Sequence, residues 1–115
     1  MMEQPGRAYV SSWHMASFAV VHKIPTRLET VRLPAIFQWP ETAEVGALAA
    51  YGPRFTDTWR QRARIAVKIL RGTKPADIPV EQPARFELVI NLRAARAIGH
   101  EVPPGLVLRA DKVIE

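Results

Sequence analysis

Residues 47–71 read ALAAYGPRFTDTWRQRARIAVKILR, and this stretch decides the fold. The apolar run 47–51 predicts a short strand that Gly52-Pro53 stops. From about residue 53 to residue 71, apolar side chains recur at three- and four-residue steps, which is typical of one face of an amphipathic helix. These side chains are Phe55, Trp59, Ala63, Ala66, Val67 and Leu70. Gly72 suits the end of this helix, and Pro75 prevents its continuation.

Short apolar segments on either side extend the alternation of strand and helix. We expect strands near residues 33–38, 47–51 and 86–90, and a short helix over 40–44 that Gly46 ends. Because helices or long connectors separate these strands, we expect them to be mainly parallel. The pattern predicts an α/β fold, a three-layer Rossmann-like fragment with a short sheet.

The last third of the chain contains two further helix signals. Asn91 is a favourable N-cap for a helix over 92–98, and Gly99 closes that helix. Pro103-Pro104 then predicts a last helix that runs to about Ile114.

Composition narrows the class of protein. The 115 residues fit one small domain, with a net charge of +5 and a pI of about 10.2. A basic balance permits an anionic partner such as nucleic acid, or simply a solvated basic surface. The chain has no cysteine, so a disulfide framework and a thiolate metal site are excluded. The longest apolar-leaning stretch, residues 8–21, is too short to span a bilayer and makes a poor signal peptide.

Catalytic and cofactor motifs are not encoded. His14, His22 and His100 have no metal-binding spacing, and no glycine loop or nucleophile elbow is present. Glu41 and Glu44 lie one turn apart and can in principle form an acid–base pair, although acids near a helix N-terminus are the simpler interpretation. We therefore expect a protein that is not an enzyme and that needs no metal or cofactor.

Trp39 and Tyr51 stand out by position, because each lies at or just past the C-terminal end of a predicted strand. In open α/β sheets, ligands bind in the crevice outside those ends. An aromatic ring there can stack on a planar or apolar ligand, or it can pack in the core or at a subunit contact.

The order of several segments resembles the C-terminal part of a family of ABC-transporter substrate-binding proteins with the type I periplasmic-binding fold. The segments are LPAIF (33–37), YGP (51–53), LRGTKPADIPVEQP (70–83), FELVINL (86–92), PP (103–104) and RADKVI (109–114). The resemblance divides the chain into an unmatched segment, 1–32, and a family-like domain, 33–115.

The resemblance implies a non-enzymatic receptor, periplasmic by family, that closes on an amino acid or similar ligand and delivers it to an ABC permease. It places Tyr51 and Gly52 near the ligand cleft, with Trp39 as a weaker candidate. A complete member is about three times longer and has a signal peptide, so the resemblance also implies a truncated chain that is incomplete for transport. As written, this chain carries no clear export signal, so we expect a cytoplasmic location if it is expressed as written.

A missing second lobe has a consequence for assembly. The apolar face of the 53–71 helix then lies in water, which favours a homodimer or higher oligomer with Phe55 and Trp59 in or beside the interface. The competing expectation is that residues 1–32 cover the same face within one chain. The alternative function is a small basic interaction module that binds nucleic acid or a protein partner. Nucleic-acid-binding surfaces usually combine basic and aromatic side chains on one face, whereas the aromatic residues of this helix lie on its apolar side. We therefore expect no nucleic acid as a partner.

Overall fold

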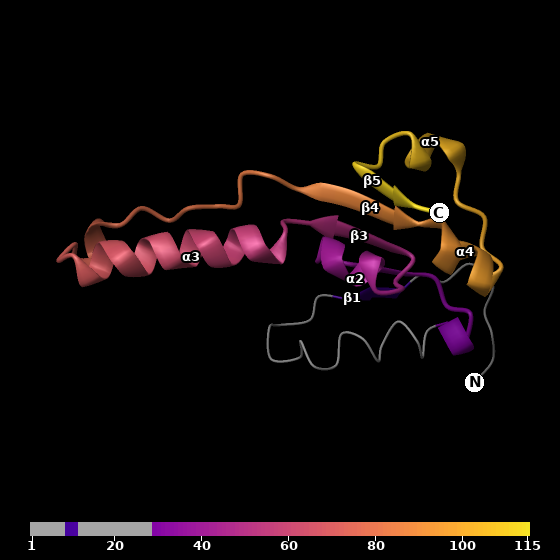
Figure 1. Ribbon diagram of the computed structural model, residues 1–115, viewed down its shortest axis with the longest axis horizontal. Helices are drawn as coiled ribbons and strands as arrows, with labels where there is room; N and C mark the ends of the chain where they lie inside the picture. The colour runs from indigo at the N-terminus through magenta and orange to yellow at the C-terminus, as the bar shows by residue number, and fades with distance from the viewer. Residues whose placement is uncertain (1–8, 12–28) are drawn as a thin grey trace.

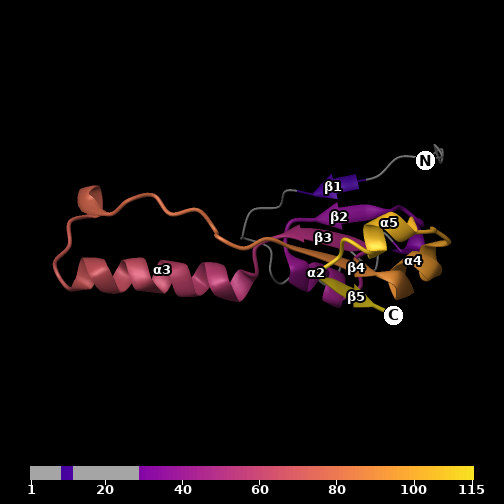
Figure 2. The same cartoon turned by 90° about the horizontal axis from the view of Figure 1, so that it is seen from above.

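The computed structural model describes residues 9–11 and 29–115 as an α/β fold (Figures 1 and 2). Its sheet has five strands in the order β1-β2-β3-β4-β5. The strands are β1 (Tyr9–Ser11), β2 (Ala35–Phe37), β3 (Ala49–Gly52), β4 (Glu87–Asn91) and β5 (Lys112–Ile114). All neighbouring pairs are parallel except β3 and β4. The predicted α/β class with a mainly parallel sheet is confirmed.

The helices follow the sequence pattern closely at most positions. They are α2 (Pro40–Glu44), α3 (Phe55–Leu70), α4 (Leu92–Ile98) and α5 (Pro104–Val107), with a 3₁₀ turn at Pro75–Asp77. The Asn91 side chain accepts a hydrogen bond from the Ala94 N–H and so caps α4, as predicted. Gly99 ends α4 in the left-handed region, with φ of 70°.

The predicted last helix is wrong beyond Val107. Residues Lys112–Ile114 form β5 instead, parallel to β4. Asp111 extends this pairing, because its backbone N–H donates to the Leu88 carbonyl and its side chain accepts from the Leu88 N–H, both at 2.8 Å. The hydrogen-bonding edge of β4 therefore outweighs the local helix signal of Pro103-Pro104.

One pair of this mainly parallel sheet, β3 and β4, runs antiparallel. The chain leaves the sheet after Gly52, runs outward as α3, and returns along an extended connector to Glu87 (Figure 1). We call residues 53–86 the arm. Because the arm goes out and comes back on one side of the sheet, β4 enters beside the end of β3 and pairs with it antiparallel. The connector contacts α3 through Glu81, which accepts a hydrogen bond from Gln61 and pairs with Lys68.

The core lies between the sheet and α2. It consists of Ala35, Phe37, Ala43, Ala47, Ala50 and Val89, with Ile114 packed against it. The alanines let α2 lie close to the sheet, since a small side chain permits close backbone approach. Buried Asn91 ties these parts together, because its side-chain amide also donates to the Ala43 carbonyl at 2.8 Å. By contrast, α3 has no buried residue.

Gly52 ends β3 at a point of close backbone approach. A Cβ added to Gly52 would lie 1.9 Å from the Gln38 carbonyl oxygen, and backbone cannot move aside as a flexible side chain does. The chain therefore needs glycine here for space, at the junction of β2, β3 and the arm.

Gly52→Ala is expected to lower the free energy of unfolding by about 1–3 kcal/mol, because the added methyl group forces a backbone shift. Urea denaturation followed by circular dichroism measures the change. Gly105→Ala is the matched control, because a Cβ there meets nothing within 4 Å. A Gly52→Ala variant as stable as Gly105→Ala would contradict the argument.

Candidate functional site

The ends of several elements meet where the arm leaves the sheet. Strands β2 and β3 end here, α2 begins here, α3 departs and β4 enters (Figure 2). We call this side of the sheet the arm edge. Trp39, Tyr51 and Gly52, which sequence analysis selected as ligand-binding candidates, all lie on it.

Trp39 begins a row of aromatic rings that runs from the sheet onto α3. It is the N-cap residue of α2 and is half-buried. Its ring meets Phe55 edge-on at 5.3 Å between centroids, and Phe55 meets Trp59 edge-on at 5.7 Å. Edge-to-face contacts of this kind add stability beyond the area that they bury. The structure therefore joins a predicted ligand residue, Trp39, to the two predicted interface residues.

Tyr51 lies on the other face of the sheet. Successive side chains of a strand point to opposite faces, and Ala50 points into the core against α2. The Tyr51 ring is 56% exposed and stacks at a tilt on Phe86, 5.8 Å away. Trp39 and Tyr51 thus share the arm edge but have different aromatic partners.

An ionic cluster at the arm edge was not foreseen from the sequence. Arg54, the last residue before α3, donates from Nε to Glu87 and from Nη1 to Glu44, each at 2.9 Å. Lys112 of β5 also donates to Glu44, at 3.0 Å. Glu41 accepts from the Phe55 N–H at 3.0 Å and so satisfies one of the free amides at the start of α3. The sequence gives no signal for this cluster, since Arg54 and Glu87 are far apart along the chain.

The charges of this cluster perturb two groups. Burial alone would raise the pKa of the Glu44 carboxyl, but hydrogen bonds from Lys112 and Arg54 outweigh burial and hold the pKa below its usual range. The Glu44 hydrogen bond raises the pKa of Arg54, so this guanidinium stays charged. Glu44 is engaged in ion pairs, which favours a structural role over the acid–base pair with Glu41.

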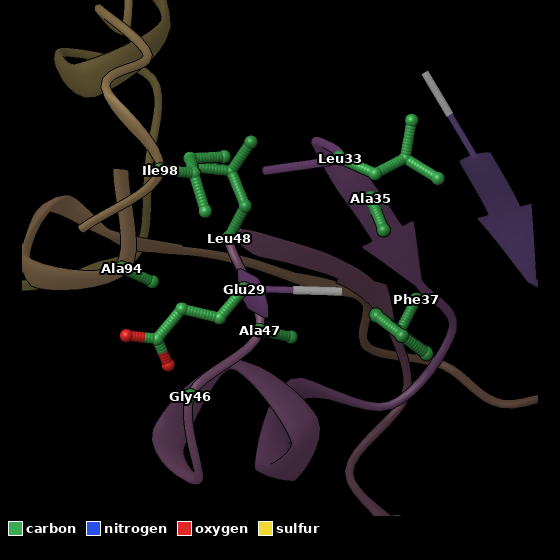
Figure 3. Close-up of a pocket in the computed structure, with 9 residues that line it drawn as sticks. All are labelled: Glu29, Leu33, Ala35, Phe37, Gly46, Ala47, Leu48, Ala94 and Ile98. Atoms are coloured by element: carbon green, nitrogen blue, oxygen red, sulfur yellow. The ribbon is translucent and has the colours of Figure 1, made fainter. Parts of the chain in front are cut away.

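A cavity lies elsewhere, between α4 and the starts of β2 and β3 (Figure 3). Its volume is about 20 Å³, room for about one water molecule. Its lining is mostly apolar and includes Leu33, Leu48 and Ile98, but none of the three ligand candidates. This cavity is too small for an amino acid.

Two other kinds of site have no counterpart among the described residues. No group of three or more His, Asp or Glu side chains within 9–11 and 29–115 is arranged to hold a metal ion. In the same part of the chain, none of the helices has the length and apolar character that crossing a membrane requires.

Comparison with known proteins identifies the family. Residues 9–114 match the family described as ABC transporter substrate binding protein. The match begins within segment 1–32, which sequence analysis left unassigned, and includes β1. A search of curated proteins finds no match.

Solved structures show the same fold. A conserved domain protein from Vibrio cholerae O1 biovar El Tor superposes with a TM-score of 0.73 at 24% identity, over 83% of this chain and 32% of that one. An ABC domain from Streptococcus pneumoniae in complex with L-Trp superposes with a TM-score of 0.66 at 27% identity, over 79% of this chain and 32% of that one. A ligand-free, open substrate-binding protein from Clostridium difficile superposes with a TM-score of 0.50 at 24% identity, over 84% of this chain and 32% of that one. This chain spans about a third of the length of each.

The chain belongs to the ABC transporter substrate binding protein family, as the resemblance in its sequence implied. This family is a non-enzymatic class whose members are typically periplasmic or extracellular.

The ionic cluster predicts how stability depends on pH. Because the Glu44 pKa is lower folded than unfolded, its contribution is fully present above the ordinary value of 4.5 and is lost as pH falls through the depressed folded pKa. Glu44→Gln should therefore cost free energy of unfolding at neutral pH, and this cost should shrink below pH 4.5. Urea denaturation of both proteins across pH 3–7 measures the difference. A difference that stays constant down to the lowest pH would refute the assignment.

Proposed function

We propose that this chain is part of the solute-binding component of an ABC transport system and that its ligand is an amino acid or a similar small molecule. The observation that carries the proposal is the family match over residues 9–114. The Streptococcus pneumoniae structure, which is in complex with L-Trp, supports an amino acid as the ligand class.

The arm edge is the proposed binding surface, with Trp39, Tyr51 and Gly52 as ligand-binding residues. It lies outside the C-terminal ends of β2 and β3, where α/β sheets bind ligands. Trp39 and Tyr51 offer aromatic surface for an apolar or planar side chain. Gly52 brings backbone close to Gln38, so main-chain groups rather than a side chain occupy this point.

We further propose that the chain alone is incomplete for transport. A ligand site usually encloses 70–90% of a small ligand in roughly 300–1,000 Å³. The cavity described above is far smaller, and none of the three arm-edge candidates lines it. Transport would then require the rest of the receptor, an ABC permease as partner and a periplasmic location. Catalysis forms no part of this proposal.

The alternative, a basic interaction module for nucleic acid or a protein partner, has weaker support. Four basic side chains of the arm are paired with carboxylates: Arg54, Arg60, Lys68 and Arg85. Paired cations release fewer counterions when they meet a phosphate backbone, so they contribute less to nucleic-acid affinity.

Ligand binding is tested by titrating the ¹⁵N-labelled chain with L-Trp and branched amino acids and recording amide chemical shifts. We expect weak, millimolar binding with shifts at Trp39, Tyr51 and Gly52, because one open surface buries little of the ligand. Trp39→Ala should abolish the shifts, whereas Leu108→Ala, an exposed position on the α5 side, should leave them unchanged. Absence of shifts with every amino acid would refute the ligand class. Micromolar binding by a monomer would refute incompleteness.

The exposed face of α3 supports a homo-oligomer. Trp59 is 47% exposed and Leu70 is 86% exposed, with Val67 and Ala63 also open to solvent. Burying one large apolar side chain stabilises by roughly 1.5–3 kcal/mol. We propose a homodimer in which Phe55 and Trp59 lie in or beside the contact. The competing expectation, cover by residues 1–32, lies mostly outside the described residues.

Light scattering at high micromolar concentration should give a mass near twice the 12.9 kDa of the chain. Trp59→Ser should weaken the dimer by roughly tenfold or more, because truncating a central tryptophan commonly costs about 2 kcal/mol or more. Leu108→Ser is the control, since Leu108 is 87% exposed but lies far from α3 along the chain. A monomer mass for the unmodified chain would reject the proposal.

A further inference from the structure

The direction of the arm relative to the sheet needs a physical cause. Helix α3 has no buried residue, and it extends away from the sheet in both views (Figures 1 and 2). A helix in this position is normally oriented by packing of an apolar face. Here most of that face is open to solvent, and its contact with the sheet unit lies at the first turn, where Phe55 meets Trp39, so packing along the helix does not set its direction.

The ionic cluster lies where the arm joins the sheet. Arg54 immediately precedes α3, while Glu44 ends α2 and Glu87 begins β4. One guanidinium therefore bonds carboxylates from two separate elements of the sheet unit, Nη1 to Glu44 and Nε to Glu87. The guanidinium is planar and its donors are fixed in direction, so two such bonds define an orientation as well as a distance.

Secondary contacts hold these carboxylates in place. Lys112 of β5 donates to the same oxygen of Glu44 that Arg54 uses. Glu41 of α2 fixes the first turn of α3 through the Phe55 N–H. Arg85, at the returning end of the arm, lies 3.7 Å from Glu87. Both ends of the arm therefore meet the Glu87 carboxylate.

Burial distinguishes this cluster from ordinary surface ion pairs. The Glu87 side chain is only 11% exposed and Arg54 is 26% exposed, whereas Arg60 and Asp57 of α3 are 72% and 55% exposed. Exposed pairs contribute little and are screened by salt, while a buried carboxylate that loses its partner is strongly unfavourable. Loss of the Arg54 bonds is thus expected to move the arm so that water reaches Glu87.

We propose that Arg54, Glu44 and Glu87 form an ionic clamp that fixes the direction of the arm, and that Arg54 is a positioning residue of the arm edge. The clamp keeps Phe55 against Trp39, and its role in ligand binding rests on the proposed function. Its role in arm orientation does not, so the two can fail separately.

The test measures the orientation of the arm without ligand. The chain has no cysteine, so Arg64→Cys on α3 and Ala97→Cys on α4 give two unique spin-label sites, both exposed. Double electron–electron resonance reports the distance between them, and dilution with unlabelled protein suppresses contributions from between copies. The parent protein is expected to give one narrow distance distribution.

Arg54→Ala is expected to replace this narrow peak with a broad distribution. Arg54→Lys should broaden it as well, because a single ammonium does not reproduce the two directed bonds. Arg60→Ala, which removes an ion pair internal to α3, is the matched control and should keep the narrow peak.

Three results would overturn the clamp. These are an unchanged distribution in Arg54→Ala, equal broadening in Arg60→Ala, or an unchanged distribution in Glu44→Gln if Arg54→Ala fails to fold. Circular dichroism checks that each variant is folded. If the clamp holds but amino acids give no shifts at the arm edge, the ligand proposal fails and arm positioning stands.

Discussion

The antiparallel pairing of β3 with β4 is the constraint on which the rest of this structure depends. It sets Gly52 opposite Glu87 and so places the two ends of the arm side by side. Arg54 is then within reach of Glu87, and Tyr51 within reach of Phe86. In a sheet that was parallel throughout, a crossover would begin and end at opposite edges, and neither contact would form.

Local signals were sufficient for much of this fold. The 3.6-residue period of residues 53–71 predicted α3 to within two residues, because its apolar spacing and Gly72 are both local features. Asn91 and Gly99 identified both ends of α4 for the same reason. The family, too, followed from the order of short motifs along the chain.

Features that depend on distant partners could not be read in this way. Strand β5 is only three residues long and forms by pairing with β4. Its own residues carry no clear strand signal, and sequence analysis assigned them to the end of a helix. The bonds from Arg54 to Glu44 and Glu87 require the fold before the partners can be identified. At the candidate site, the sequence predicted that Trp39 and Tyr51 lie at the same edge of the sheet. It gave no indication that Trp39 packs against Phe55 whereas Tyr51 packs against Phe86.

The out-and-back course of the arm also bears on the order in which this protein folds. The central pair of strands joins residues on either side of 53–86, so the sheet is completed only when that long loop closes. The entropy cost of closure grows slowly with loop length, and local structure within the loop reduces the freedom left to lose. Early formation of α3, which is 16 residues long, would stiffen much of the loop before its ends meet. Formed early, a helix that has no buried residue of its own would thus assist assembly of the sheet.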